Sequence, residues 1–94
     1  MLRFDWDEVK NKNNRIKHGV WFEEALGVFD DPHGRLFGDP EHSDEEERLI
    51  LLGMSSWGRT LVVVHCYEDS DSLVRIISAR KATKKELRFY EEGI

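Results

Sequence analysis

The sequence predicts a single α+β domain in which helices pack against an antiparallel β-sheet. Three observations lead to this fold class. Helical patterns lie near both ends of the chain, strand patterns follow one another between them, and the turns joining the strands are only four or five residues long. Such turns form hairpins, because a parallel crossover needs a dozen residues or more. The length of 94 residues suffices for one modest core, so we expect one domain over residues 1–94.

The chain is expected to begin with a short strand and a helix. Leu2–Asp5 can form the strand, and either Asp5 or Asp7 can cap a helix that begins near Glu8. The helix should stop at Gly19, where a left-handed residue can end it after basic residues in its last turn. The apolar residues expected to share one face of this helix are Trp6, Val9 and Ile16.

A second helix is predicted over Trp21–Phe29, and Pro32 prevents it from continuing. Its apolar residues follow the i, i+3, i+4, i+7 spacing of a buried helix face. They are Phe22, Ala25, Leu26 and Phe29. Residues 32–43 read as a loop that holds at best a short strand over Arg35–Phe37.

The second half of the chain predicts a meander followed by a helix. Strands are expected over Arg48–Met54, Arg59–Tyr67 and Leu73–Arg80, separated by polar turns. Thr83 and Glu86 then form the signature of a capping box, which opens a helix running to about residue 92. Leu87 and Tyr90 should face the sheet from this helix.

Charge and cysteine content limit the function classes. The formal net charge is −5, and the acidic residues are concentrated between residues 21 and 56. This balance argues against a general nucleic-acid binder, although both ends of the chain could still assemble a local basic surface. The single Cys66 cannot form an internal disulfide, and the N-terminus carries no hydrophobic stretch of signal-peptide length. We therefore expect a cytoplasmic protein.

Two arginines are the sharpest candidates for a binding site. Arg59 opens one predicted strand and Arg80 closes the next, so a hairpin should bring both to the same end of the sheet. Together they could clamp a phosphate, with Lys81 and the N–H groups at the start of the last helix adding to the anion site. The alternative is that both arginines are ordinary solvated residues at strand ends, and spacing alone does not decide between the two.

His18 is the candidate for proton transfer, because imidazole titrates near neutral pH. Its position at a helix C-terminus equally suits a capping histidine. His65 lies among valines and is expected to be a semi-buried structural residue, while His33 and His42 lie in a polar loop. The four histidines have no metal-binding spacing, so neither a metal nor another cofactor is expected.

Beyond these single residues, a series of short segments matches one family in order and spacing. The segments are Phe4-Asp5-Trp6-Asp7, Lys17-His18-Gly19-Val20, Phe22-Glu23-Glu24-Ala25, Val28-Phe29-Asp30-Asp31-Pro32, Glu46-Glu47-Arg48, Gly58-Arg59-x-Leu61-x-Val63-Val64, Arg75-Ile76-Ile77-Ser78-Ala79-Arg80-Lys81-Ala82-Thr83 and Glu86-x-x-x-Tyr90-Glu91. The chain resembles the BrnT family of toxins from about residue 4 to residue 93. Each segment is weak alone, but the ordered set is specific.

The resemblance implies a RelE-like fold, with two N-terminal helices and a C-terminal helix on an antiparallel meander. It also implies the toxin of a type II toxin–antitoxin module, which cleaves mRNA without a metal ion and thereby inhibits translation. The expected partner is a BrnA-like ribbon-helix-helix antitoxin, with which the toxin represses its own operon. DNA would be contacted only through that antitoxin.

Residue roles follow from the same resemblance. His18, Arg59 and Arg80 match the family's motifs and would be catalytic, while Lys17 and Lys81 would hold RNA. Trp21 departs from the family pattern, in which a small polar helix cap is common at this position. A catalytically degenerate module, serving mainly as antitoxin partner and co-repressor, is the alternative function.

Overall fold

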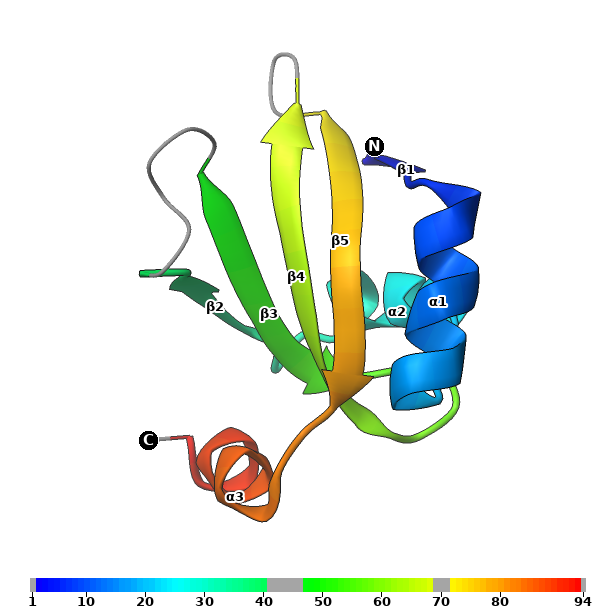
Figure 1. Ribbon diagram of the computed structural model, residues 1–94. Coiled ribbons are helices and arrows are strands. Elements are labelled where there is room, and N and C mark those ends of the chain that lie inside the picture. The colour runs from blue at the N-terminus through cyan, green and yellow to red at the C-terminus, as the bar shows by residue number, and fades with distance from the viewer. Residues whose placement is uncertain (1, 41–46, 69–71, 94) are drawn as a thin grey trace.

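The computed structural model describes residues 2–40, 47–68 and 72–93, and it is an α+β structure (Figure 1). In chain order the elements are β1 (Arg3–Asp5), α1 (Glu8–His18), α2 (Phe22–Ala25), the 3-10 helix η1 (Leu26–Asp30), β2 (Arg35–Gly38), β3 (Arg48–Met54), β4 (Thr60–Glu68), β5 (Leu73–Lys81) and α3 (Lys84–Glu92). None of the helices in these segments is long and apolar enough to span a bilayer.

The sheet is mixed rather than purely antiparallel. Its strand order is β1-β5-β4-β3-β2, and every neighbouring pair except one is antiparallel. β1 lies parallel to β5, with Phe4 opposite Val74. Nearly seventy residues separate these two positions in sequence, which is ample for a parallel connection. The expected antiparallel pairing of the three strands between Arg48 and Arg80 is found in β3, β4 and β5, whereas the expectation of a purely antiparallel sheet is wrong because β1 pairs parallel to β5.

The core lies between the sheet and the segment that holds α1, α2 and η1. α1 lies beside β5, whereas α3 lies at the end of the sheet where β5 finishes (Figure 1). The central core cluster of buried apolar residues is Val20, Phe22, Ala25, Val28, Leu61, Val63, Val74, Ile76 and Ala79. β4 and β5 thus supply the sheet side of the core, as the valines of β4 and the valine and isoleucines of β5 predict.

A β-bulge in the β4–β5 pair changes which side chains share a face. The register shifts between Val64 and His65, so Val64 pairs with Ser78 while His65 pairs with Ile76. Simple alternation would place Ile76 and Ser78 on one face. The extra residue instead turns Ile76 into the core and moves Ser78 to the opposite face, because a bulge breaks the period of two.

α1 docks through asparagines and not through the apolar face that its sequence suggested. Val9 and Ile16 are 66% and 83% exposed, whereas Asn11 and Asn14 are buried. The Asn14 amide donates to Val20 O and Ala79 O, both at 2.8 Å, and its Oδ1 accepts from Ala79 N. The helix is therefore joined to β5 by buried hydrogen bonds, which satisfy otherwise unpaired backbone groups.

Both ends of α1 follow the predicted caps. Asp7 is the N-cap and accepts from Val9 N, which settles the choice between Asp5 and Asp7. Gly19 ends the helix in the left-handed region, at φ 74°. A side chain is strained in this conformation, so glycine suits the position.

The predicted second helix is divided into α2 and η1. Trp21 is the N-cap of α2 and makes no capping hydrogen bond with its side chain. η1 then tightens the backbone where Gly27 meets the turn after β3, since a Cβ at Gly27 would lie 2.7 Å from Ser56 N. The single helix expected over Trp21–Phe29 is thus wrong in its second half.

α3 opens with the predicted capping box of Thr83 and Glu86. Its Phe89 ring lies under the Arg35 guanidinium, 4.2 Å from centroid to Cζ, and the Tyr90 hydroxyl donates to Asp31 at 2.5 Å. Leu87 remains exposed. The helix therefore faces the body of the protein through Phe89 and Tyr90 instead of the expected Leu87 and Tyr90.

Candidate active site

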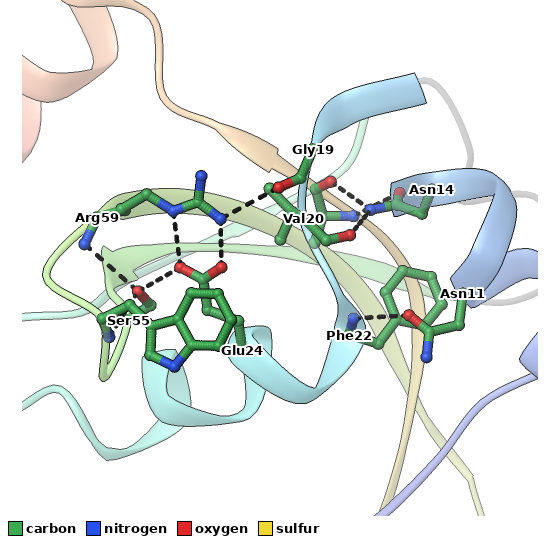
Figure 2. A network of polar contacts seen from close by, with 10 residues as sticks. Asn11, Asn14, Gly19, Val20, Phe22, Glu24, Ser55 and Arg59 are labelled. Carbon is green, nitrogen blue, oxygen red and sulfur yellow. Dashed lines mark hydrogen bonds and ion pairs between the residues drawn. The ribbon is translucent and has the colours of Figure 1, made fainter. Parts of the chain in front are cut away.

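Arg59 is held in a polar network at the start of β4. Its Nε donates to Glu24 Oε2 at 3.0 Å, and its Nη2 donates to Glu24 Oε1 and to Gly19 O. Ser55 completes the network by donating its hydroxyl to Glu24 Oε2 at 2.7 Å (Figure 2). A bidentate arginine–carboxylate pair fixes both the orientation of the guanidinium and its distance from the carboxylate, so the Arg59 side chain has one well-defined position.

The partner carboxylate is fully buried. The Glu24 side chain has no solvent exposure, while that of Arg59 is 32% exposed. Burial acts to raise the pKa of Glu24, but hydrogen bonds from Arg59 and Ser55 outweigh it, and Lys81 adds a favourable charge. The net result is a pKa below the ordinary value, so this carboxyl is ionised at neutral pH.

The guanidinium of Arg59 keeps one free end. Among the described residues no partner bonds its Nη1, and Figure 2 shows this nitrogen directed away from Glu24. A charged donor that is fixed on one side and open on the other can donate a hydrogen bond to a phosphate oxygen.

His18 and Lys17 lie beside this network. They are the last two residues of α1, immediately before Gly19, whose carbonyl accepts from Arg59 at 3.2 Å. Lys17 is exposed and His18 is half-buried, and no hydrogen bond from the His18 ring is found within the described segments. The Lys-His-Gly motif thus adjoins Arg59, an association that strand pairing alone could not reveal.

Arg80 is also paired with a carboxylate. Its Nη1 and Nη2 donate to Glu86 at 2.8 and 2.9 Å, and its Nη1 also donates to Lys81 O at 3.3 Å. Hydrogen bonds lower the pKa of Glu86 to about 2, and the largest contribution comes from Arg80, followed by Thr83. α3 is therefore joined to the end of β5 by a charge pair.

The structure does not bring Arg59 and Arg80 together into the expected clamp. Both lie at the predicted end of the sheet, where Ala82 N donates to Thr60 O at 3.0 Å. Arg80, however, is opposite Val62, whereas Arg59 falls on the face of Leu61. Alternation directs the two side chains to opposite faces of the sheet, and Lys81 shares the face of Arg59.

Neither carboxylate is predicted from the sequence as the partner of an arginine. Glu86 carried a usable signal, because the capping box places it one helical turn after Thr83 and near Arg80. Glu24 carried only a weak one, as a charged residue between the apolar Phe22 and Ala25 on a short helix. Its partner Arg59 is 35 residues away.

The remaining candidates fall outside the network. His65 is fully buried against Phe29, not semi-buried as expected, and burial lowers its pKa. Within the described segments its Nε2 has no hydrogen-bond partner. His33 lies on the loop after η1, and His42 lies outside the described residues. Trp21 is 38% exposed with the Arg15 guanidinium 5.8 Å from its ring. No cluster of three or more metal-binding side chains occurs in the segments described.

Comparison with known proteins settles the family. The sequence model described as "Ribonuclease toxin, BrnT, of type II toxin-antitoxin system" matches residues 6–86. The chain belongs to the BrnT family. This confirms the resemblance seen in the sequence motifs, and membership of a type II system implies an antitoxin partner for this toxin.

A solved structure supports the same fold. The crystal structure of the Brucella abortus ribonuclease toxin BrnT aligns with a TM-score of 0.66 and 21% sequence identity, covering 89% of this chain and 100% of that one. At this identity the likeness concerns the fold. A search of curated protein sequences gave no match.

Proposed function

We propose that this BrnT-family toxin is a metal-independent endoribonuclease with a RelE-like fold that cleaves mRNA and so inhibits translation in the cytoplasm. The observation that carries the proposal is the fixed Arg59 guanidinium, open at Nη1 and adjoining the Lys-His-Gly motif. A site for phosphodiester cleavage needs cations where charge develops and a group that can move a proton. Arg59 and His18 supply these two chemistries.

In the proposed reaction the ribose 2′-oxygen attacks the adjacent phosphorus, and the bond to the 5′-oxygen of the next nucleotide breaks. The products are a 2′,3′-cyclic phosphate and a free 5′-hydroxyl, so the proton lost by the 2′-hydroxyl is balanced by one gained by the leaving oxygen. Arg59 stabilises the charge on the phosphoryl oxygens, and His18 transfers a proton. Lys17 and Lys81 hold the RNA backbone as exposed cations.

Arg80 takes part in this proposal only when a phosphate displaces Glu86. The carboxylate occupies both arms of the Arg80 fork, and phosphate would use the same donors. Arg80 therefore acts as a second cation for bound RNA, on the other face of the sheet end.

The proposed partner is a BrnA-like ribbon-helix-helix antitoxin. The toxin–antitoxin complex would repress its own operon, with DNA contacted by the antitoxin alone. The formal net charge of −5 supports this division, because an acidic toxin is poorly suited to bind DNA directly.

Mapping of RNA ends after induction of the toxin tests the proposal. We expect new cleavage ends in mRNA with the wild type, and their loss in folded His18→Ala and Arg80→Ala variants. Arg88→Ala serves as a matched control, because this exposed arginine pairs with Glu92 along its own helix. Cleavage by purified toxin should persist in EDTA. Loss of cleavage with chelator and recovery with a divalent ion would contradict the metal-independent mechanism.

The carboxylate pairing favours one alternative, a catalytically degenerate module. Both candidate arginines are already bound to glutamates, as expected of groups that serve stability only. A toxin that binds its antitoxin and represses the operon, yet generates no RNA ends and no growth arrest, would establish this alternative.

A further inference from the structure

We propose that Trp57 forms a stacking surface for an unpaired RNA base beside the phosphate-binding Arg59. This inference rests on the proposed ribonuclease function and identifies a subsite for its substrate. The inference starts from the side chain of Trp57, which is exposed to solvent on a hydrogen-bonded turn.

Trp57 lies on the turn between β3 and β4 and is 65% exposed, compared with 38% for Trp21. The turn beneath it is fixed by hydrogen bonds. Ser55 Oγ accepts from Trp57 N at 3.2 Å, and Ser55 O accepts from Gly58 N at 3.0 Å. Gly58 adopts φ 82°, which a glycine permits without strain. The backbone that carries the ring is thus fixed by hydrogen bonds, so little backbone entropy is lost on stacking.

The same turn carries the proposed phosphate ligand. The Arg59 Cζ lies 6.0 Å from the centre of the Trp57 ring. Ser55 links the two residues, because its hydroxyl accepts from the turn and donates to Glu24, which fixes Arg59. One rigid unit therefore offers an aromatic face and an open guanidinium. Proteins that bind single-stranded RNA combine these two groups, one for the base and one for the backbone.

The surroundings of Trp57 favour RNA over a protein partner. The core of a protein interface is a contiguous apolar surface with few charges. Here the neighbours on the turn are Ser56 and Gly58, which are exposed and have no apolar side chain, and the next residue is the cation Arg59. Lys81 lies on the same face of the sheet. An exposed indole beside polar residues and cations suits a nucleotide.

The test measures binding of a short, fluorescently labelled single-stranded RNA with 2′-O-methyl riboses, which block the attacking hydroxyl. Fluorescence anisotropy gives Kd for the wild type, Trp57→Ala, Trp57→Phe and the control Leu36→Ala. Leu36 is 55% exposed on β2 and lies outside the proposed subsite. Loss of one stacked base should weaken binding by about 5- to 150-fold in Trp57→Ala. Trp57→Phe should retain most of the affinity, and Leu36→Ala should equal the wild type.

A series of RNAs with a single abasic position adds a second readout. For the wild type, one abasic position should weaken binding more than the others. In Trp57→Ala this preference should disappear, because the protein no longer has a ring for that base to contact. Simple loss of fold would lower the affinity for all RNAs alike, and far-UV circular dichroism checks the fold of each variant.

Two negative results have different meanings. If the wild type binds the RNA and Trp57→Ala binds it equally, the subsite is wrong while the ribonuclease function stands. If the wild type neither binds nor cleaves RNA, both proposals fail. Weaker antitoxin binding by Trp57→Ala, with unchanged RNA binding, would assign Trp57 to a protein interface and overturn the inference.

Discussion

Replacing Arg59 with alanine should destabilise the toxin, because the substitution leaves the Glu24 carboxylate buried without its counter-ion. The Glu24 side chain has no exposure to solvent, and Arg59 supplies most of its hydrogen bonds. Removal of one partner of a buried pair costs about 3–5 kcal/mol. Since Arg59 is 32% exposed, water can partly replace it, and we expect a loss near 3 kcal/mol. A small domain has only about 5–15 kcal/mol of stability in total.

The pH dependence of this loss follows from the Glu24 carboxyl. In the wild type its folded pKa is below the ordinary value of 4.5, so it contributes stability above pH 4.5 that is lost as pH falls through the folded pKa. In Arg59→Ala the burial persists and the largest compensating group is gone, so the folded pKa should rise above 4.5. Protonation then relieves the buried charge as pH falls. The stability gap between wild type and variant should therefore be largest at neutral pH and narrower in acid.

Urea unfolding followed by circular dichroism measures both effects. Glu24→Gln combined with Arg59→Ala should be more stable at neutral pH than Arg59→Ala alone, because a neutral amide needs no counter-ion. The control is Glu68→Gln, which removes the Arg75–Glu68 pair, whose side chains are both about a third exposed. We expect Glu68→Gln to lower the free energy of unfolding by less than about 1 kcal/mol. If Arg59→Ala costs no more than Glu68→Gln, or if the double variant shows no recovery, the buried-charge reasoning is refuted.

Three further predictions concern the elements that support the site. Asn14→Ala should lower the free energy of unfolding by about 1–3 kcal/mol for each buried group left unpaired, including the backbone of Ala79. Replacement of the exposed Asn13 with alanine is the control and should leave urea unfolding unchanged. Glu86→Gln should destabilise at neutral pH but not near pH 2, because the wild-type carboxylate contributes stability that is lost between pH 4.5 and its folded pKa of about 2. Equal destabilisation by this variant at both pH values would contradict that role. Gly19→Ala should lower the free energy of unfolding by about 1–2 kcal/mol, because an alanine is strained in the left-handed conformation of this residue. A steric clash adds nothing, since no atom lies within 4 Å of the added Cβ. An unchanged urea midpoint would refute this.

The sequence predicts well those features that depend on a few neighbouring residues. Strand β3 occupies the expected Arg48–Met54, and the capping box of Thr83 and Glu86 opens α3. Each signal lies within a few adjacent residues, so tertiary context has little influence on it. The position of Arg59 and Arg80 at one end of the sheet was also predictable, because a hairpin fixes which strand ends meet.

Features that depend on distant partners were not predictable in the same way. The bulge near Val64 carries no glycine or proline in its strand, yet it places Ile76 and Ser78 on opposite faces of the sheet. The apolar spacing of Val9 and Ile16 suggested a shared helix face, yet both side chains are exposed. Periodicity reports which residues share a face but not which face the rest of the protein covers.

The buried asparagines of α1 have a consequence for the candidate site. Asn14 holds Val20 O and the backbone of Ala79, and Arg59 holds Gly19 O. The turn after His18 is therefore linked to β5 through the Asn14 side chain and to the start of β4 through the Arg59 side chain. A buried amide satisfies its donors and acceptor in one register only, because a shifted register would leave backbone groups unpaired. Attachment through Asn14 thus fixes the backbone of His18 relative to Arg59. A proton carrier and a phosphate ligand that act on the same bond require such a fixed spacing.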